Sequence, residues 1–197
     1  TIFISLFGGI KLEYKTELIK IAAQETEIKE IFKILWSFNL NEAFLCAGSL
    51  RNLVWNHLAN RQPNFLRNNL DLIYLNQNQS YEEFLTLQEL IKLHYAKYLW
   101  NLENVYLNNL SSHQPYGKTI TAALKTIPET CNAVGLNLTR QGRFQVIAPF
   151  GLADLFNFEI HPTPIFAQDP HKLAFYQQRV AWKEWTQDWK NLKVFNR

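Results

Sequence analysis

The feature that most constrains this chain is a glycine–serine turn between a short apolar run and a helix. Residues 43–47 form a continuous apolar segment typical of a buried strand, and residues 50–60 have helical spacing. Gly48 and Ser49 lie between them. Glycine allows close backbone approach, and free amides at a helix start favour anions, so this turn could hold a phosphate. The alternative is a simple turn, because Gly–Ser pairs are common in turns.

A polar pattern follows on the next predicted strand, residues 70–75. Asn69 and Asp71 are two positions apart, so their side chains point to one face of the strand. Mg²⁺ prefers hard oxygen ligands, above all carboxylates. An aspartate beside a neutral asparagine would bind metal less tightly than an acidic pair. The alternative is a polar strand edge that binds no metal.

Arg51 and Asn52 place a cation and a hydrogen-bond donor one turn into the helix that follows Gly48. Arginine can grip a phosphate through two parallel hydrogen bonds. The same residues would also suit a solvated helix face, so the two interpretations stay open.

Composition indicates a globular protein of one domain or two small ones. The chain has 197 residues, of which 47% are hydrophobic and 19% charged. It has no apolar run long enough to cross a membrane. The apolar residues 1–7 lack the features of a signal peptide and are expected to form an N-terminal strand or a packed tail. A cytoplasmic protein is therefore expected.

Charge and metal-binding residue types exclude other classes. The net charge of +3 is mild and argues against a dedicated nucleic-acid binder. Cys46 and Cys131 are expected to be buried thiols in a reducing compartment. The histidines are scattered, and no Cys/His group has zinc-ligand spacing.

The remaining periodicities predict an α+β domain. Ser80 and Glu83 form a capping-box pattern at the start of the longest predicted helix. The predicted helices are residues 15–23, 26–35, 50–60, 80–99, 119–126 and 171–189, with a short helical turn at 151–156. The predicted strands are residues 43–47, 70–75, 100–107, 133–138 and 143–147. Residues 1–40 are expected to be a helical extension packed on a core domain of residues 41–197.

These residues together carry a family resemblance over about three quarters of the chain. The pieces are Ala47-Gly48-x-x-Arg51-Asn52, Asn68-x-x-Asp71, and the most specific stretch, Val146-Ile147-Ala148-Pro149-Phe150-Gly151-Leu152-x-Asp154. In their order and spacing they resemble the uncharacterised bacterial nucleotidyltransferase-like family, which has the DNA-polymerase-β-type nucleotidyltransferase fold. The resemblance implies a mixed β-sheet flanked by helices, with an aromatic helix at the C-terminus.

The resemblance also implies a site. Gly48 and Ser49 would hold phosphate, with Arg51 and Asn52 beside them, and Asp71 would bind Mg²⁺. Further residues implied near the cleft, together with Asn69, are Asn76 and Asn104. The implied ligands are a nucleoside triphosphate and Mg²⁺, while the acceptor and the oligomeric state stay open.

The departures from the family pattern fall where the chemistry should be. The pattern has acids at positions 69, 71 and 76, and only Asp71 is acidic here. Candidates for a further metal carboxylate are Glu103, Glu129 and Asp154. This loss of charge favours a degenerate nucleotidyltransferase with weak or no transfer. The alternatives are an active enzyme that uses Asn69 as a neutral ligand, and a non-enzymatic module.

That module would bind a partner through aromatic residues of the last helix. These are Phe175, Trp182, Trp185 and Trp189, which are spaced for one helical face. Packing in the core or an interface is the preferred interpretation of this stripe, ahead of stacking on a base.

Overall fold

A five-stranded mixed sheet forms the centre of the molecule. The computed structural model describes residues 2–111 and 118–197, with the side chains of 13–108 and 118–197. The sheet order is β3-β2-β1-β4-β5; β2 and β3 are parallel and the other pairs antiparallel. The strands are β1 (Phe44–Cys46), β2 (Asn69–Tyr74), β3 (Leu99–Asn104), β4 (Gly135–Leu138) and β5 (Phe144–Ile147). The expected α+β class is confirmed.

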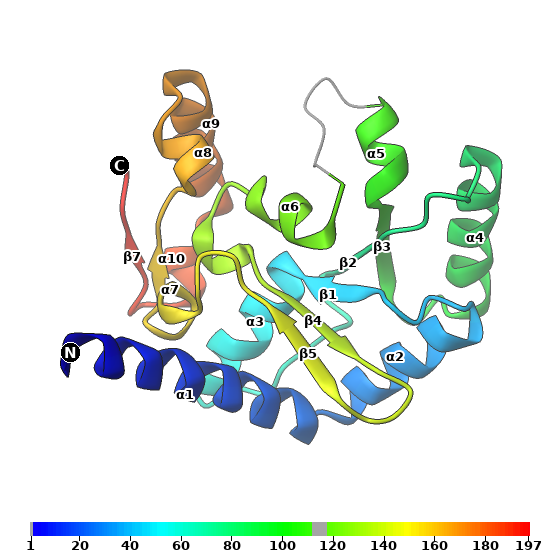
Figure 1. Ribbon diagram of the computed structural model, residues 1–197, viewed down its shortest axis with the longest axis horizontal. Coiled ribbons are helices and arrows are strands. Elements are labelled where there is room, and N and C mark those ends of the chain that lie inside the picture. Colours follow the sequence, from blue (N-terminus) through cyan, green and yellow to red (C-terminus); the bar gives the residue numbers. More distant parts are fainter. Residues whose placement is uncertain (1, 112–117) are drawn as a thin grey trace.

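Helices lie on both sides of the sheet. In Figure 1, α1 and α2 run along one side of the molecule, whereas α5, α6 and α9 lie on the other. The α-helices are α1 (Ile2–Gln24), α2 (Thr26–Ser37), α3 (Ala47–Leu58), α4 (Tyr81–His94), α5 (Val105–Ser111), α6 (Ile120–Lys125), α7 (Ala153–Phe156), α8 (Pro164–Ala167), α9 (Pro170–Lys183) and α10 (Trp185–Asp188). A 3₁₀ turn, η1 (Thr130–Asn132), follows α6, and β6 (Glu159–Ile160) pairs in parallel with β7 (Lys193–Val194).

One apolar core joins the N-terminal helices to the sheet and to the C-terminal segment. Trp55 of α3 is fully buried and its indole Nε1 donates to the Leu155 carbonyl at 2.8 Å. The Trp55 ring meets Trp189 edge to face, with centroids 5.0 Å apart. The predicted aromatic stripe is therefore divided, because Trp185 and Trp189 are buried while Trp182 is 83% exposed.

Buried and more exposed side chains alternate along both parallel strands, β2 and β3. Leu70, Leu72 and Tyr74 of β2 are buried, as are Trp100, Leu102 and Asn104 of β3. The residues between them face the other side of the sheet. Asp71 pairs with Asn101, and Ile73 pairs with Glu103. This register therefore places Glu103 on the same face as Asp71.

Several predicted boundaries are wrong. Residues 2–7 are helical and not a strand, because a short apolar run has no periodicity that distinguishes the two. As a result α1, and not α4, is the longest described helix. Helix α4 ends at His94 and not at residue 99. Strand β3 ends at Asn104 and not at residue 107, because α5 begins at Val105.

The expected C-terminal helix is also interrupted. Glu184 adopts a left-handed conformation with φ of 48°, which separates α9 from α10. The sequence also predicts a loop at residues 110–117. Residues 110 and 111 belong instead to α5, and 112–117 lie outside the described residues.

The predicted capping box is confirmed at the start of α4, the helix that connects β2 to β3. The Ser80 hydroxyl accepts from the Glu83 amide at 3.2 Å, and the Glu83 carboxylate accepts from the Ser80 amide at 2.8 Å. Two helix-start amides are thereby satisfied.

We expect Ser80→Ala to lower the free energy of unfolding by about 1 kcal/mol, because it removes this cap. Ser80→Thr keeps a capping hydroxyl and serves as the control. Urea unfolding followed by circular dichroism measures both variants. Equal midpoints for Ser80→Ala and the wild type would show that the cap contributes nothing.

Candidate active site at the edge of strands β2 and β3

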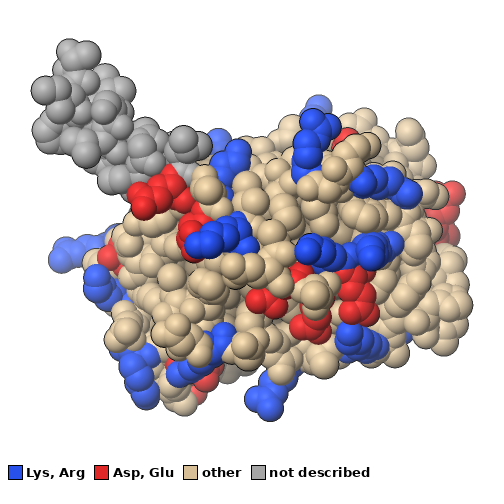
Figure 2. Space-filling model, turned by 90° about the horizontal axis from the view of Figure 1, so that it is seen from below, with Lys and Arg blue, Asp and Glu red and all other residues tan. Residues whose placement is uncertain are grey.

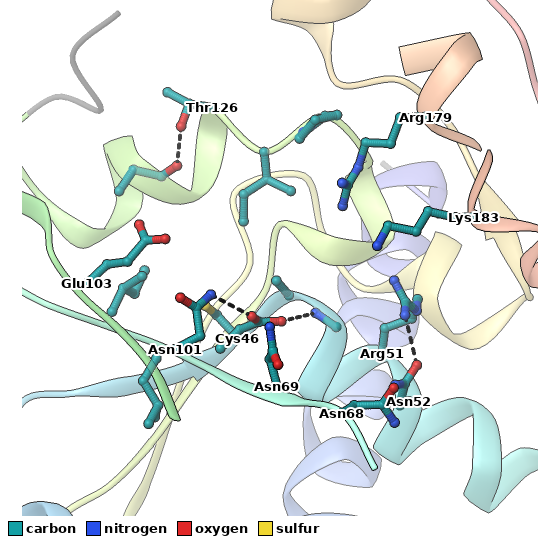
Figure 3. Close-up of a pocket in the computed structure, with 18 of the residues that line it drawn as sticks. Cys46, Arg51, Asn52, Asn68, Asn69, Asn101, Glu103, Thr126, Arg179 and Lys183 are labelled. Atoms are coloured by element: carbon teal, nitrogen blue, oxygen red, sulfur yellow. Dashed lines mark hydrogen bonds between the residues drawn. The ribbon is translucent and has the colours of Figure 1, made fainter. Parts of the chain in front are cut away.

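A pocket of about 700 Å³ opens beside the start of α3. Its floor is the outward face of β2 and β3, and its far wall includes side chains of α9 and α10. Figure 3 shows Asn101 and Glu103 on one side of this pocket, with Arg51, Arg179 and Lys183 on the other. The pocket therefore has an acidic side and a basic side.

Asp71 is the fixed point of the acidic side. Its Oδ2 accepts a hydrogen bond from the Gly48 amide at 3.1 Å, and its Oδ1 accepts from Asn101 Nδ2 at 2.9 Å. A Cβ atom on Gly48 would lie 3.0 Å from Asp71 Oδ2, tighter than an ordinary contact. Glycine is therefore needed here for a close approach, but to a carboxylate of the same chain.

Ser49 connects α3 to β2 and does not line the pocket. Its hydroxyl accepts from the Asp71 amide at 2.8 Å and donates to the Asn69 carbonyl at 3.1 Å. The residue is 4% exposed. Of the pair proposed from sequence to hold phosphate, only Gly48 lies at the pocket wall.

Glu103 supplies a second carboxylate on the acidic side. Burial and the nearby negative charge of Asp71 raise the pKa of Glu103 above its ordinary value. The Asn108 side chain donates to Glu103 Oε2 at 2.9 Å. A cation bound between Glu103 and Asp71 would relieve this repulsion.

The other two acid candidates lie outside the pocket lining. Glu129 is fully buried, and Arg179 Nε donates to its Oε1 at 2.7 Å. Asp154 accepts a hydrogen bond from the Thr130 hydroxyl. Among the three candidates from sequence, the structure therefore brings only Glu103 to Asp71.

The asparagines are divided between two locations. Asn69 lines the pocket and is exposed at the start of β2. Asn104 is fully buried on the opposite face of the sheet, where its Nδ2 donates to the Asn76 carbonyl at 2.9 Å. Asn76 and Asn104 therefore join the end of β3 to the loop after β2, and neither lines the pocket.

Arg51 is a positioned cation and not part of a solvated helix face. It is 6% exposed, and its guanidinium donates to Asn132 Oδ1 at 3.0 Å and to Asn52 Oδ1 at 2.8 Å. The guanidinium lies 4.3 Å from the centre of the Trp185 ring. Burial lowers the pKa of Arg51, and its Nε has no hydrogen-bond partner among the described residues. Asn52 also lines the pocket.

The basic side was missed by the site prediction. Arg179 and Lys183 of α9 line the pocket, as do Arg67 and Asn68 before β2. The sequence did hold a signal, because Arg179 and Lys183 are four residues apart and share a helix face. What it lacked was any indication that α9 returns to the start of α3.

Basic and acidic side chains are interspersed on the face drawn in Figure 2 and do not form a single basic patch there. This pattern agrees with the mild net charge of +3. No helix in the described ranges is both long and apolar enough to span a bilayer.

Comparison with known proteins identifies the fold. Residues 33–194 match the model of a family described as nucleotidyltransferase. An NMR structure described as revealing a CCA-adding enzyme head domain is 33% identical, with a TM-score of 0.80. That similarity covers 92% of this chain and 96% of the other. None of the curated proteins matches this chain.

Two larger structures share the fold at low identity. A CCA-adding enzyme in complex with CTP is 16% identical with a TM-score of 0.56, over 90% of this chain and 43% of that one. The Thermotoga maritima CCA-adding enzyme complexed with tRNA is 15% identical with a TM-score of 0.55, over 90% and 42%. This chain spans less than half the length of either. The expectation that nucleic acid is not a partner gains no support from these structures.

The raised pKa of Glu103 generates a pH prediction. Because the pKa of Glu103 is raised in the native state, its contribution to stability is complete at pH values below the ordinary glutamate pKa of about 4.3. That contribution is lost as the pH rises through the native-state pKa. The half-buried Glu103 carboxylate therefore contributes less to stability at pH 7 than at pH 4.

We expect Glu103→Gln to raise the free energy of unfolding at pH 7, and to raise it less at pH 4. The amide keeps an oxygen that can accept from Asn108. Urea unfolding at both pH values measures the change, with Glu42→Gln in the exposed turn before β1 as the control. A gain for Glu103→Gln that is the same at both pH values would contradict this account of its charge.

Proposed function

The chain belongs to the nucleotidyltransferase family whose model matches residues 33–194, and on this premise we propose that it binds Mg²⁺ and a nucleoside triphosphate and transfers the nucleotidyl group slowly. The observation that carries the proposal is that Asp71 and Glu103 lie together on one face of β2 and β3. They lie opposite a basic wall formed by Arg51, Arg179 and Lys183. The fold places these groups from four separate segments in one pocket.

Asp71 and Glu103 have the chemistry of a Mg²⁺ site. Magnesium is usually held by one or two carboxylates together with substrate phosphates and water. Burial of Glu103 beside Asp71 is electrostatically unfavourable, and a bound cation would offset it. When bound, Mg²⁺ neutralises phosphate charge and aligns the attacking and leaving oxygens. Asn101 and the Gly48 amide hold the Asp71 carboxylate in its orientation.

The basic wall would bind the triphosphate. Arg51 is held at the wall by Asn52 and Asn132, so little side-chain entropy remains to be lost on binding. Arg179 and Lys183 add charge from α9. In nucleotidyl transfer an acceptor oxygen attacks the α-phosphorus while the bond to pyrophosphate breaks. These cations would stabilise the charge that develops on the leaving pyrophosphate.

Asn69 explains why we propose slow transfer. Asn69 lines the pocket two residues before Asp71 on the same strand, and its amide oxygen carries no charge. Phosphoryl-type transfer depends mainly on positioning and electrostatic stabilisation. Loss of one charged group there lowers the rate by on the order of 100-fold or more.

A second candidate is nucleotide binding without transfer. Both Asp71 carboxylate oxygens already accept hydrogen bonds from the protein, and Asn69 adds no charge. This arrangement favours binding of a metal–nucleotide over rapid chemistry. The two candidates share a ligand and differ only in turnover.

We expect the wild type to bind at least one nucleoside triphosphate more tightly with Mg²⁺ than without it. We expect Asp71→Asn to remove that Mg²⁺ dependence, because it removes a metal carboxylate. Isothermal titration calorimetry with ATP, CTP, GTP and UTP measures both effects. Absence of Mg²⁺-dependent binding to all four nucleotides would overturn the proposal.

Turnover separates the two candidates. We expect Asn69→Asp to raise pyrophosphate release by on the order of 100-fold, with water or a short RNA as acceptor. Asn78→Asp makes the same change at an exposed position outside the pocket and should leave the rate unchanged. Release by neither the wild type nor Asn69→Asp, with binding intact, would reject transfer and favour the second candidate.

A further inference from the structure

A second group of ligand-type side chains lies outside this pocket. Asp154 of α7, Glu159 of β6 and His161 just after β6 each offer one ligand atom, and these atoms all lie within 4.8 Å of one another. All three residues are half-buried, and none of them lines the pocket beside Asp71.

Neighbouring residues hold the side chains of Asp154 and His161 in position. Thr130 of η1 donates its hydroxyl hydrogen to Asp154 Oδ2 and its amide to the His161 carbonyl at 3.0 Å. The imidazole of His161 stacks on Phe195, with ring centroids 3.9 Å apart and planes at 11°. Such supporting contacts are typical of metal ligands, because they fix the orientation of the donor atoms.

The spacing between His161 and Glu159 suits a bridging ion better than a direct hydrogen bond. His161 Nε2 lies 3.6 Å from Glu159 Oε2, which is longer than a hydrogen bond. Two ligands on a tetrahedral zinc ion, each about 2.1 Å from the metal, lie about 3.4 Å apart. The observed separation is therefore close to the one that a shared metal requires.

One neighbouring cation competes for the same carboxylate. Lys193 Nζ lies 3.3 Å from Glu159 Oε1, the oxygen that does not face His161. The Lys193 side chain is 63% exposed and can move into solvent without loss of packing. It can also stay, because a carboxylate can bind the metal through one oxygen and the lysine through the other.

We propose that Asp154, Glu159 and His161 bind one divalent transition-metal ion of the zinc class. An imidazole nitrogen with two carboxylates selects zinc-like ions over Mg²⁺, which prefers an all-oxygen shell. Three protein ligands leave the fourth position for water. The ion would join α7 to β6, next to the η1 segment that begins after Glu129. Glu129 is the buried partner of Arg179, so the bound metal would stabilise the segment that holds Arg179 at the pocket.

The proposal does not rest on nucleotidyl transfer, and zinc binding tests it directly. The full chain, stripped with EDTA and exchanged into buffer, is titrated with ZnCl₂ by calorimetry and by thermal unfolding. We expect one tight site and a rise in Tm. His161→Phe keeps a ring to stack on Phe195 but removes the ligand, and should weaken zinc binding by more than about tenfold.

Matched variants exclude other sites. His171→Ala, at an exposed position on α9, should bind zinc like the wild type. Asp71→Asn should also retain the tight site, and this result would separate the zinc site from the pocket. Cys46 and Cys131 are buried, so they do not offer an accessible thiol to zinc. MgCl₂ should not displace the zinc. Equal zinc affinity in His161→Phe and the wild type, or loss of binding in Asp71→Asn, would overturn the proposal.

Discussion

Parallel pairing of β2 with β3 is the constraint on which the rest of the candidate site depends. It fixes Asp71 opposite Asn101 and places Glu103 on the same face, two residues after Asn101. A register shift of one residue would turn Glu103 toward the core and expose Asn104 instead. The buried residues Trp100 and Leu102 oppose such a shift, because they would then lose their apolar contacts. Core packing on one face thus sets the chemistry on the other.

The start of α3 is tied to this strand pair by polar contacts. Gly48 and Ser49 bond to the side chain and the backbone of Asp71, so the helix start and the carboxylate form one unit. The turn that could serve as a phosphate cradle instead positions an acid. Arg51, one turn later, is fixed between Asn52, Asn132 and the Trp185 ring. Charges of both signs are therefore held rigidly on opposite sides of one pocket.

Local sequence was enough to predict some of this arrangement. The alternation around Asp71, the small residue at Gly48 and the capping box at Ser80 each act over a few residues, and the structure shows each element. Alternation along residues 100–104 likewise puts Glu103 and Asn104 on opposite faces of their strand. It could not reveal which face meets Asp71, because that depends on pairing between strands about 30 residues apart.

Other parts of the site depend on contacts that no local pattern encodes. Arg179 reaches the pocket because α9 packs back across the fold, and its partner Glu129 is 50 positions away in sequence. The cluster at Asp154, Glu159 and His161 is different, because its donors lie within eight residues of the sequence. Its spacing matches no zinc motif, and the turn from α7 into β6 brings the donors together.

The central claim is that Asp71 and Glu103 act together on one bound cation. A double-mutant cycle tests it by measuring Mn²⁺ affinity for the wild type, Asp71→Asn, Glu103→Gln and the double variant by electron paramagnetic resonance. If both carboxylates hold one ion, each single variant loses most of the affinity and the double variant loses far less than the sum of the two losses. Additive losses, or a single variant that binds Mn²⁺ as tightly as the wild type, would contradict a shared site.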